Sequence, residues 1–557
     1  MKSNIQKLPG ICLPPLSDVI YMRDIKQRKA EAKTGINVSI GIYDDPEQQR
    51  QSEIVLNVSD GNTFIVGSSQ SGKTTMLQSI IYGITSRYTP NEANIYIVDC
   101  GTMSLKAFEA SCHVGGVVVN GEDEKISNLF KMLHKSMSQR KNIFAQKGLG
   151  TYKAYLEAGF EDLPQIIVII DNMSAFKEYF SKMDEMFALL IREGQSLGIN
   201  FIVTGNQANA LGARAMANFS NRIALFCNER AEYSNLFDRC RIEPKETPGR
   251  GLCIIDKRIL EFQTALAFEG SKEIERVNNM KKFIEENSKK YDSSMAKEIP
   301  MVPAILRYED MKAKNRHLYD KKYNIPFAIS FSEVEYVSLE LATMGAIAIV
   351  GEVQSGKTNM VRLVLQTLYA TMFDNISNAY IIDSDDGMLS EYKDKPFVKA
   401  YESNVEGLSR IVENVYATYM QRKLKLAEMK GDSQKEYLNE CPLEFLVIDN
   451  WDAVNHLCKD KEITAKLLEL CREGRRAKIA VMFSNVENSK ISNISSNDVM
   501  KFFAENKKFV IFSDLDKIKI VDVPIRGVKD AGKPLEPGDA YYVVNGNFTK
   551  LKTAFMD

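Results

Sequence analysis

One short pattern occurs twice in the chain, and it constrains the fold more than any other feature. The pattern is G-x-x-x-x-G-K-[ST], and its two copies begin at Gly67 and Gly351. In such a loop, successive backbone N–H groups converge on the phosphates of a nucleotide, and the following helix directs its positive end toward them. The residues expected to bind nucleotide are Gly67, Ser68, Ser69, Gln70, Ser71, Gly72, Lys73, Thr74 and Thr75 in the first copy and Gly351, Glu352, Val353, Gln354, Ser355, Gly356, Lys357, Thr358 and Asn359 in the second.

Both loops lie in the sequence context that a phosphate-binding loop requires. A short apolar run leads into each loop, as expected of a buried parallel strand, and apolar residues at helical spacing follow it. We expect Lys73 and Lys357 to reach the β- and γ-phosphates, and the hydroxyls of Thr74 and Thr358 to bind Mg²⁺. The sequence therefore predicts two sites for ATP with Mg²⁺.

The duplication extends beyond the loops. Asp99 follows Lys73 by 26 residues, and Asp383 follows Lys357 by the same 26 residues. An Arg-Glu-Gly segment followed by an apolar strand also recurs in the same order in both halves. Because strands alternate with helices in each half, we predict an α/β fold with two tandem P-loop NTPase domains, each with a mostly parallel central sheet.

The repeat sets the expected domain boundaries. We expect a lead-in linker over residues 1–35, a first ATPase domain over residues 36–295 and a second over residues 296–557. Residues 271–290 are charged and helix-prone, and a short linker-like stretch follows them. A lead-in without a domain of its own indicates a C-terminal fragment of a longer chain.

An aspartate ends a second apolar strand in each half. Four apolar residues precede Asp171 and Asp449. A buried strand of this kind places its carboxylate beside the loop threonine, Thr74 or Thr358, where it can bind Mg²⁺ directly or through water. The alternative for either residue is an ordinary aspartate at the end of a strand.

The residues after these aspartates, Asn172 and Asn450, bear on catalysis. Many P-loop ATPases have a glutamate there that orients or activates the attacking water. Asparagine can hold a water by hydrogen bonds but cannot accept its proton. Since loss of a general base commonly costs a factor of roughly 10²–10⁴ in rate, we predict slow hydrolysis at both sites. Asp452 is a possible substitute in the second half.

Three further side chains are candidates for sensing or completing the site. Thr204 and Ser484 end strands where a sensor of the γ-phosphate is expected, and capping of the strand end is the alternative. Arg222 could reach the nucleotide of a neighbouring subunit as an arginine finger, or could form a structural salt bridge. The second half has Lys508 at the aligned position, and lysine cannot make the bidentate fork to a phosphate.

Composition disfavours several function classes. The formal net charge is −1, without the positive excess typical of proteins that grip duplex DNA, so DNA is not the expected partner. The nine cysteines and four histidines show no metal-ligand spacing, and scattered cysteines favour a reducing, cytoplasmic compartment. No apolar stretch is long enough to span a bilayer, and the first residues lack the apolar core of a signal peptide.

Taken together, these residues resemble the RecA-like FtsK/SpoIIIE branch of P-loop ATPases. The tandem loops, the Asp-Asn pairs and the Arg-Glu-Gly segments are most similar to the C-terminal part of EssC/EccC, the membrane-anchored motor ATPase of type VII (WXG100/ESX) secretion. The resemblance covers about residues 36–270 and 325–557. It implies the second and third ATPase domains of a longer chain, with transmembrane helices and a first ATPase domain upstream.

The resemblance also implies partners. It implies a homo-hexamer of the full-length protein at the cytosolic face of the cell membrane, in contact with other secretion-machine subunits. The last ATPase domain would capture secreted WXG100-type proteins through a C-terminal signal, and nucleotide would act partly as a structural clamp. Two alternatives stay open, namely a DNA translocase of the same branch and a non-catalytic, nucleotide-locked peptide-binding module. A DNA translocase of this branch would be expected to carry a winged-helix domain after the motor. Residues 515–557 instead predict short strands that close the second domain, and no basic helix follows.

Overall fold

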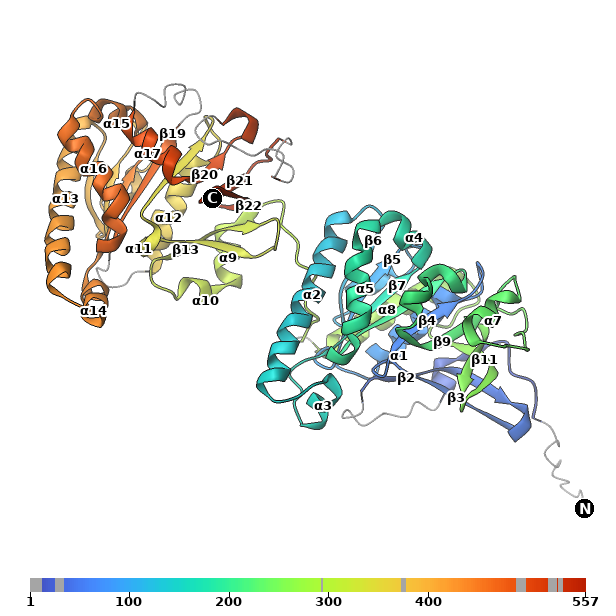
Figure 1. Ribbon diagram of the computed structural model, residues 1–557. Coiled ribbons are helices and arrows are strands. Elements are labelled where there is room, and N and C mark those ends of the chain that lie inside the picture. The colour runs from blue at the N-terminus through green and yellow to red at the C-terminus, as the bar shows by residue number, and fades with distance from the viewer. Residues whose placement is uncertain are drawn as a thin grey trace, which may run out of the picture. The chain divides into compact units, whose positions relative to one another are not determined.

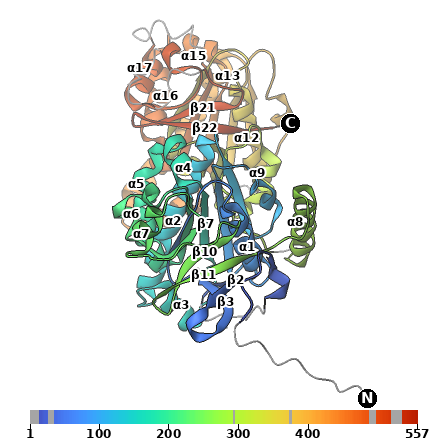
Figure 2. The same ribbon diagram turned by 90° about the vertical axis from the view of Figure 1, so that its right-hand side faces the viewer.

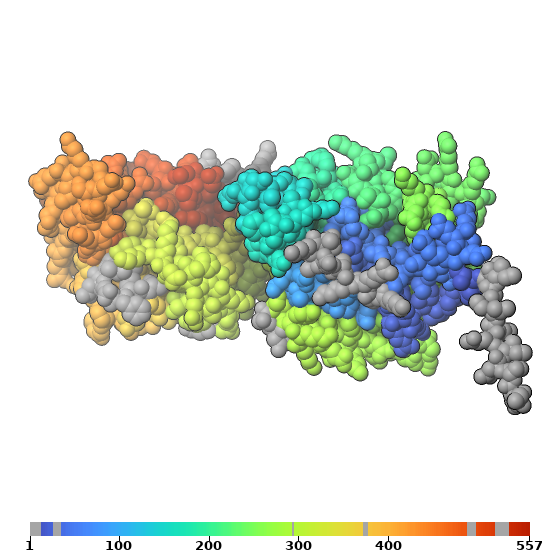
Figure 3. Space-filling view, turned by 90° about the horizontal axis from the view of Figure 1, so that it is seen from below, coloured from blue at the N-terminus to red at the C-terminus, as the bar shows by residue number. Residues whose placement is uncertain are grey.

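The computed structural model describes residues 13–25, 35–291, 294–371, 377–486, 497–518, 528 and 534–556. The pattern of contacts between residues divides the protein into two compact units, Met1–Met301 and Val302–Asp557 (Figure 1). In the space-filling view, the first unit is coloured from blue to green and the second unit from yellow to red (Figure 3). Residues 1–12 and 26–34 of the predicted lead-in linker lie outside the described ranges.

Unit 1 is built on one sheet of 11 strands in the order β3-β2-β11-β10-β9-β4-β8-β7-β5-β6, with β1 paired to β11. The run from β9 to β6 is parallel, and β10, β11, β2 and β3 extend it in antiparallel fashion. The strands are β1 (Ile20–Tyr21), β2 (Asn37–Asp45), β3 (Arg50–Asn57), β4 (Asn62–Val66), β5 (Ala93–Asp99), β6 (Val114–Val119), β7 (Gln165–Asp171), β8 (Ile199–Gly205), β9 (Phe219–Leu225), β10 (Arg250–Ile255) and β11 (Arg258–Leu266).

Helices cover both faces of this sheet (Figures 1 and 2). They are α1 (Lys73–Thr85), α2 (Asp123–Gln146), α3 (Tyr152–Glu157), α4 (Met173–Tyr179), α5 (Asp184–Glu193), α6 (Ala213–Met216), α7 (Ala231–Phe237) and α8 (Glu273–Ser288). Apolar residues of α1 and α8 share one core cluster with the strands, and those of α2, α4, α5 and α7 share another. Burial on both faces explains why the central strands are continuously apolar instead of alternating.

Unit 2 repeats the topology of unit 1 strand for strand. Its sheet has 11 strands in the order β14-β13-β22-β21-β20-β15-β19-β18-β16-β17, with β12 paired to β22. The strands are β12 (Leu306–Arg307), β13 (Asn324–Ser330), β14 (Tyr336–Glu340), β15 (Ala346–Gly351), β16 (Ser377–Ile382), β17 (Val398–Glu402), β18 (Leu443–Ile448), β19 (Ile479–Val486), β20 (Lys508–Phe512), β21 (Asp539–Val544) and β22 (Asn547–Phe555).

The helices of unit 2 again pack on both faces of their sheet. They are α9 (Tyr308–Lys314), α10 (Arg316–Tyr319), α11 (Leu341–Met344), α12 (Lys357–Thr371), α13 (Val405–Glu428), α14 (Asp432–Glu440), α15 (Trp451–Leu457), α16 (Lys461–Glu473) and α17 (Asp498–Asn506). The predicted α/β fold with two mostly parallel central sheets is confirmed. Among the described residues, no helix combines the length and apolar character needed to cross a membrane.

Candidate nucleotide-binding sites

The first phosphate-binding loop joins the carboxyl end of β4 to α1. Gly72 has a φ of 102°, and a Cβ at this position would lie 2.8 Å from the backbone nitrogen of Gly249, so the turn requires glycine. Lys73 lies across the loop, where its Nζ donates to the carbonyls of Gly67 and Ser68 at 2.6 and 2.8 Å. The lysine is thus at the centre of the loop, as expected of a phosphate ligand.

The second loop has the same construction at the carboxyl end of β15. Gly356 has a φ of 106°. Lys357 Nζ donates to the carbonyls of Gly351 and Glu352 at 3.0 and 2.6 Å, and the lysine side chain is buried. The two sites therefore share their backbone geometry as well as their sequence pattern.

Each loop also contains a buried hydroxyl. Ser71 Oγ and Ser355 Oγ have no hydrogen-bond partner among the described residues. A Cβ on Gly67 would come within 2.4 Å of the first hydroxyl, and one on Gly351 within 2.5 Å of the second. A narrow turn with an unused donor and converging N–H groups fits the phosphate chain of a nucleotide.

In unit 1, Asp171 at the end of β7 joins the loop to the neighbouring strand. Its Oδ2 accepts from Thr74 Oγ1 at 2.9 Å, and its Oδ1 accepts from Thr204 Oγ1 at 2.6 Å. The backbone N–H of Asn172 donates to the same Thr204 hydroxyl at 2.8 Å. Burial, and secondarily the charge of Asp99, raise the pKa of Asp171, so the site disfavours the bare carboxylate and favours a cation beside it.

In unit 2, Asp449 at the end of β18 differs. Its side chain is 1% exposed, yet neither carboxylate oxygen accepts a normal hydrogen bond from the described residues. Burial, together with the charge of Asp383, raises the pKa of Asp449 to about 7, and the adjacent Ser484 hydroxyl lowers it only in part. That hydroxyl is itself buried without a hydrogen bond of normal geometry. An unsatisfied buried carboxylate fits a divalent cation.

The two asparagines act as helix caps. Asn172 Oδ1 accepts from the backbone N–H of Ala175 at 3.3 Å, at the start of α4. Asn450 Oδ1 accepts from the N–H of Ala453 at 2.9 Å at the start of α15, and its Nδ2 donates to the carbonyl of Ser403 at 3.0 Å. Both amides are therefore used to begin a helix, and neither supplies a proton acceptor.

Arg222 and Lys508, its counterpart in unit 2, both donate to backbone carbonyls. Arg222 on β9 donates from Nε to the carbonyl of Phe219 at 3.3 Å and from Nη1 to that of Leu236 at 3.2 Å. Lys508 on β20 donates to the carbonyl of Met344 at 2.5 Å. Both cations are thus bound to backbone within their own unit, and the arginine-finger role of Arg222 stays a prediction.

Sequence reasoning did not assign Asp99 and Asp383 to the sites. Asp99 is buried and accepts from the backbone N–H groups of Gly101 and Leu105 at 3.1 and 3.0 Å. Asp383 is equally buried and accepts from the N–H of Leu389 at 2.9 Å. Each carboxylate thus holds the loop that follows its own strand, beside Asp171 in unit 1 and Asp449 in unit 2. The signal was their equal spacing from the loop lysines, which marked the repeat but not a role.

Each unit therefore brings a phosphate-binding loop and a buried aspartate together at the carboxyl ends of parallel strands. This arrangement is that of a P-loop NTPase domain, and the chain carries two of them in tandem. The roles predicted for individual residues remain predictions.

Comparison with known proteins then specifies the family. The model described as "FtsK/SpoIIIE family" matches residues 21–242. The chain is 27% identical to the type VII secretion system protein EssC of Staphylococcus aureus (strain MRSA252) over 98% of its length, and 26% identical to the ESX secretion system protein EccC of Geobacillus thermodenitrificans over 99%. It spans 36% of the length of each relative. The predicted resemblance is confirmed: residues 21–242 match the FtsK/SpoIIIE family model, and nearly the whole chain is similar to proteins named EssC and EccC.

Solved structures support the fold. The chain is similar to EssC (ATPases 2 and 3) from Geobacillus thermodenitrificans, with a TM-score of 0.77 and 24% identity over 98% of this chain and 100% of that one. It is also similar to Thermomonospora curvata EccC (ATPases 2 and 3) in complex with a signal sequence peptide, with a TM-score of 0.59 and 18% identity over 98% and 97% of the two chains.

Proposed function

We propose that this chain is the ATP-binding motor and receptor module of a type VII secretion ATPase. Unit 1 and unit 2 act as the second and third ATPase domains of a longer protein, bind ATP with Mg²⁺ and recognise secreted WXG100-type proteins. The names of the relatives and the matched pair of ATPase domains support this assignment. The parent protein would act at the cytosolic face of the cell membrane, as a hexamer and with other secretion-machine subunits.

Nucleotide binding would depend on a few residues in each unit. Lys73 and Lys357 would hold the phosphates, and Asp171 and Asp449 would hold Mg²⁺ with the loop threonines. When bound, Mg²⁺ offsets the negative charge of the phosphates and of the buried carboxylate. Hydrolysis would be slow because the residue after each aspartate caps a helix and offers no carboxylate to the attacking water. Tight binding with slow turnover suits a structural clamp.

The proposed receptor role starts from a comparison of two sheet edges. In unit 1 the edge strand is β6, and a segment of the same unit covers it. The segment after residue 294 runs beside β6, where Ala296 N–H donates to the carbonyl of Cys112 at 2.7 Å and Ile299 N–H donates to that of Gly115 at 3.0 Å. Ile299 is 5% exposed, and a Cβ on Gly116 would lie 2.8 Å from its Cδ1. The edge of β6 therefore binds an extended segment of the same unit, with an isoleucine as its anchor.

The corresponding edge of unit 2 is β17. The sheet registers pair Tyr96 with Gly116 in unit 1 and Tyr380 with Ala400 in unit 2, so Ala400 takes the place of Gly116. Tyr96 OH donates to the carbonyl of Lys297, in the segment on β6, at 2.7 Å. In contrast, every residue of β17 is at least partly exposed, and no described segment is hydrogen-bonded along its outer edge.

This contrast is the observation that carries the receptor proposal. A strand edge with unused backbone groups can add a further strand from another chain. We assign the β17 edge to an extended segment near the C-terminus of a secreted WXG100-type protein, in the way that β6 binds residues 296–299. A signal sequence peptide is bound in the Thermomonospora curvata EccC complex, which supports a peptide ligand for this chain.

The receptor proposal can be tested with a fluorescent peptide from the C-terminus of a WXG100-type protein. We expect Ala400→Phe to fill the small site on β17 and to weaken peptide binding at least tenfold, with nucleotide binding unchanged. Lys435→Phe, at an exposed position of α14, is the matched control and should bind like the wild type. Equal affinity of the Ala400 variant and the wild type would contradict the assignment of this edge.

The motor role is tested separately by ATP turnover. We expect retained nucleotide and slow turnover in the isolated chain, without stimulation by duplex DNA. Turnover that rises strongly with duplex DNA would instead support a translocase. Peptide binding without any turnover in the full-length parent would support a nucleotide-locked receptor.

A further inference from the structure

A basic hollow of about 610 Å³ lies in unit 2, away from the nucleotide site. Its polar lining is defined by the side chains of Lys321, Lys322, Thr343, Asn439, Arg475 and Lys478. None of the described residues that line it is acidic. Four cations around one concave site give it a local positive charge that the near-neutral composition of the chain does not reveal.

The hollow lies at the amino ends of the parallel strands. Thr343 belongs to α11, which comes just before β15, and Lys478 directly precedes β19. The phosphate-binding loop follows the carboxyl end of the same β15, which is roughly 20 Å away at about 3.3 Å per residue. The hollow is therefore separate from the ATP site, and the nucleotide chemistry proposed above does not use it.

Lys478 is buried, unlike the other three cations that line the hollow, and it is an unusual residue for its position. It is 7% exposed, with a φ of 59°. In unit 1 the aligned position, four residues after the Arg-Glu-Gly glycine, is Gly198 with a φ of 75°. This left-handed conformation is strained for a residue with a Cβ. Unit 2 thus has a buried lysine at a left-handed position where unit 1 has glycine, the residue that adopts this conformation without strain.

Neutral groups surround the Lys478 ammonium. Nζ donates to the carbonyls of Leu438, Asn439 and Cys441 at 2.9, 3.4 and 2.6 Å, at the end of α14. It also lies 4.6 Å from the centre of the Tyr323 ring. These contacts satisfy its hydrogen bonds but supply no carboxylate to balance its charge.

Other cations raise the positive charge further. Lys322 and Arg475 form no ion pair with any described residue, whereas Lys321 pairs with Glu340. Burial lowers the pKa of Lys478, and the like charges of Arg422 and Lys322 lower it again. Arg422 itself is neutralised by Glu444 at 2.6 Å. Apart from Glu340, which pairs with Lys321, no described carboxylate forms an ion pair with the cations that line the hollow, and a bound anion would supply the missing charge.

We propose that this hollow binds a compact polyanion that carries two or more phosphate groups, such as an inorganic polyphosphate or the phosphate chain of a nucleoside polyphosphate. Arg475 supplies a planar fork for phosphate oxygens, and Lys322 supplies a second exposed cation. Thr343 and Asn439 add neutral donors. The concave shape favours a compact ligand over a flat membrane surface, and this site is independent of the secretion role proposed above.

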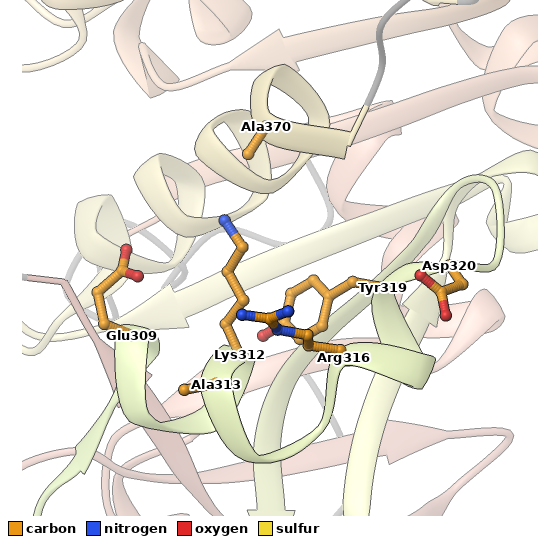
Figure 4. A pocket seen from close by; sticks show the side chains of 7 residues that line it. All are labelled: Glu309, Lys312, Ala313, Arg316, Tyr319, Asp320 and Ala370. Carbon is orange, nitrogen blue, oxygen red and sulfur yellow. The ribbon is translucent and has the colours of Figure 1, made fainter.

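A second hollow in the same unit serves as a comparison (Figure 4). It has a volume of about 570 Å³ and is lined by Lys312 and Arg316, but also by the carboxylates of Glu309 and Asp320. Figure 4 shows the arginine and lysine side chains beside the Tyr319 ring, with a carboxylate on either side. Its charges are balanced, so it provides a matched control for the loss of two positive charges.

The test uses the full chain with Lys73→Ala and Lys357→Ala, without Mg²⁺, so that the phosphate-binding loops do not compete. Inorganic tripolyphosphate is titrated calorimetrically. We expect one binding site per chain, and Lys322→Ala with Arg475→Ala should weaken binding by roughly a hundredfold, since each charged hydrogen bond contributes about tenfold or more. Lys312→Ala with Arg316→Ala removes the same charge and should change affinity less than threefold.

Two further measurements sharpen the result. Lys478→Gly restores the residue found in unit 1, so it should fold and still lose at least tenfold in affinity. Equal affinities for tripolyphosphate and a nucleoside tetraphosphate would assign recognition to the phosphate chain alone, and tighter binding of the nucleoside form would add a contact to the base. Absence of tripolyphosphate binding, equal losses in both double variants, or binding of anionic vesicles or nucleic acid alone would overturn the proposal.

Discussion

Replacing Asp449 by asparagine should stabilise unit 2 in the absence of Mg²⁺ and nucleotide. The carboxylate is buried, neither oxygen has a hydrogen-bond partner among the described residues, and its pKa is raised to about 7. A raised carboxyl pKa means that the folded state binds a proton more tightly than the unfolded state. The penalty is therefore absent below the ordinary pKa of 3.8, grows as the pH rises, and is complete above about 7.

The size of the effect follows from the shift. A rise of about 3 pKa units corresponds to about 4 kcal/mol at pH 8, since one unit is worth about 1.4 kcal/mol. At pH 5.5 only about 2 kcal/mol of this penalty is present. Burying an incompletely bonded amide costs about 1–3 kcal/mol in return. Asp449→Asn should therefore gain about 1–3 kcal/mol at pH 8 and close to nothing at pH 5.5.

The chain contains a natural reporter for this measurement. Trp451 is its one tryptophan, is 3% exposed and begins α15, two residues after Asp449. Urea unfolding followed by tryptophan fluorescence at pH 8 and at pH 5.5 would therefore report unit 2. The same variant should lose most of the stabilisation that Mg²⁺ with ATP gives the wild type, which is about 2.7 kcal/mol at a hundredfold excess over Kd.

Asp171→Asn is the matched control. Asp171 accepts hydrogen bonds from two threonines in unit 1, so this change should leave the Trp451 transition in unit 2 unaltered. A gain for Asp449→Asn that is no larger at pH 8 than at pH 5.5, or a loss of stability at pH 8, would refute the argument that the unpaired carboxylate destabilises the ligand-free site.

Three further predictions concern single residues. Lys357→Ala should reduce bound nucleotide to about one per chain, and Lys73→Ala should do the same for the other unit, as measured by chromatography of nucleotide released from the denatured protein. Asn450→Ala should cost about 1 kcal/mol of unit 2 stability through loss of a helix cap, without lowering ATP turnover; a fall of a hundredfold in turnover would reveal a catalytic role. Ile299→Ala should cost about 2–4 kcal/mol in unit 1 and leave the Trp451 transition unchanged, and coincident shifts of both units would contradict this.

Much of the fold was predictable because the two halves of the chain can be aligned with each other. Two copies of one motif series, with equal spacing from Lys73 to Asp99 and from Lys357 to Asp383, imply two copies of one sheet. The structure confirms this, since the strand orders of the two sheets are identical. Periodicity and spacing report such features directly, because buried parallel strands are continuously apolar and the loop needs glycine at fixed positions.

The differences between the copies were not predictable in the same way. The two Asp-Asn pairs are identical in sequence, yet Asp171 accepts two threonine hydroxyls and Asp449 accepts no hydrogen bond from the described residues. Thr204 and Ser484 lie near the ends of equivalent strands, but only the threonine makes a hydrogen bond of normal geometry to its aspartate. Whether a hydrogen bond forms depends on differences of a few tenths of an ångström between donor and acceptor, and on the angle between them. A sequence pattern does not contain this information.

By itself, the sequence determined that the chain has two tandem P-loop domains that resemble those of secretion ATPases, because the identity and order of the motifs can be read without the folded structure. Only the tertiary structure decided that Asn172 and Asn450 begin helices, that residues 296–299 cover β6 while β17 stays exposed, and that Lys478 meets Arg475 and Lys322 in one hollow. These features join residues that are distant along the chain. Their free energies depend on burial and on the distance between charges, which exist only once the chain has folded.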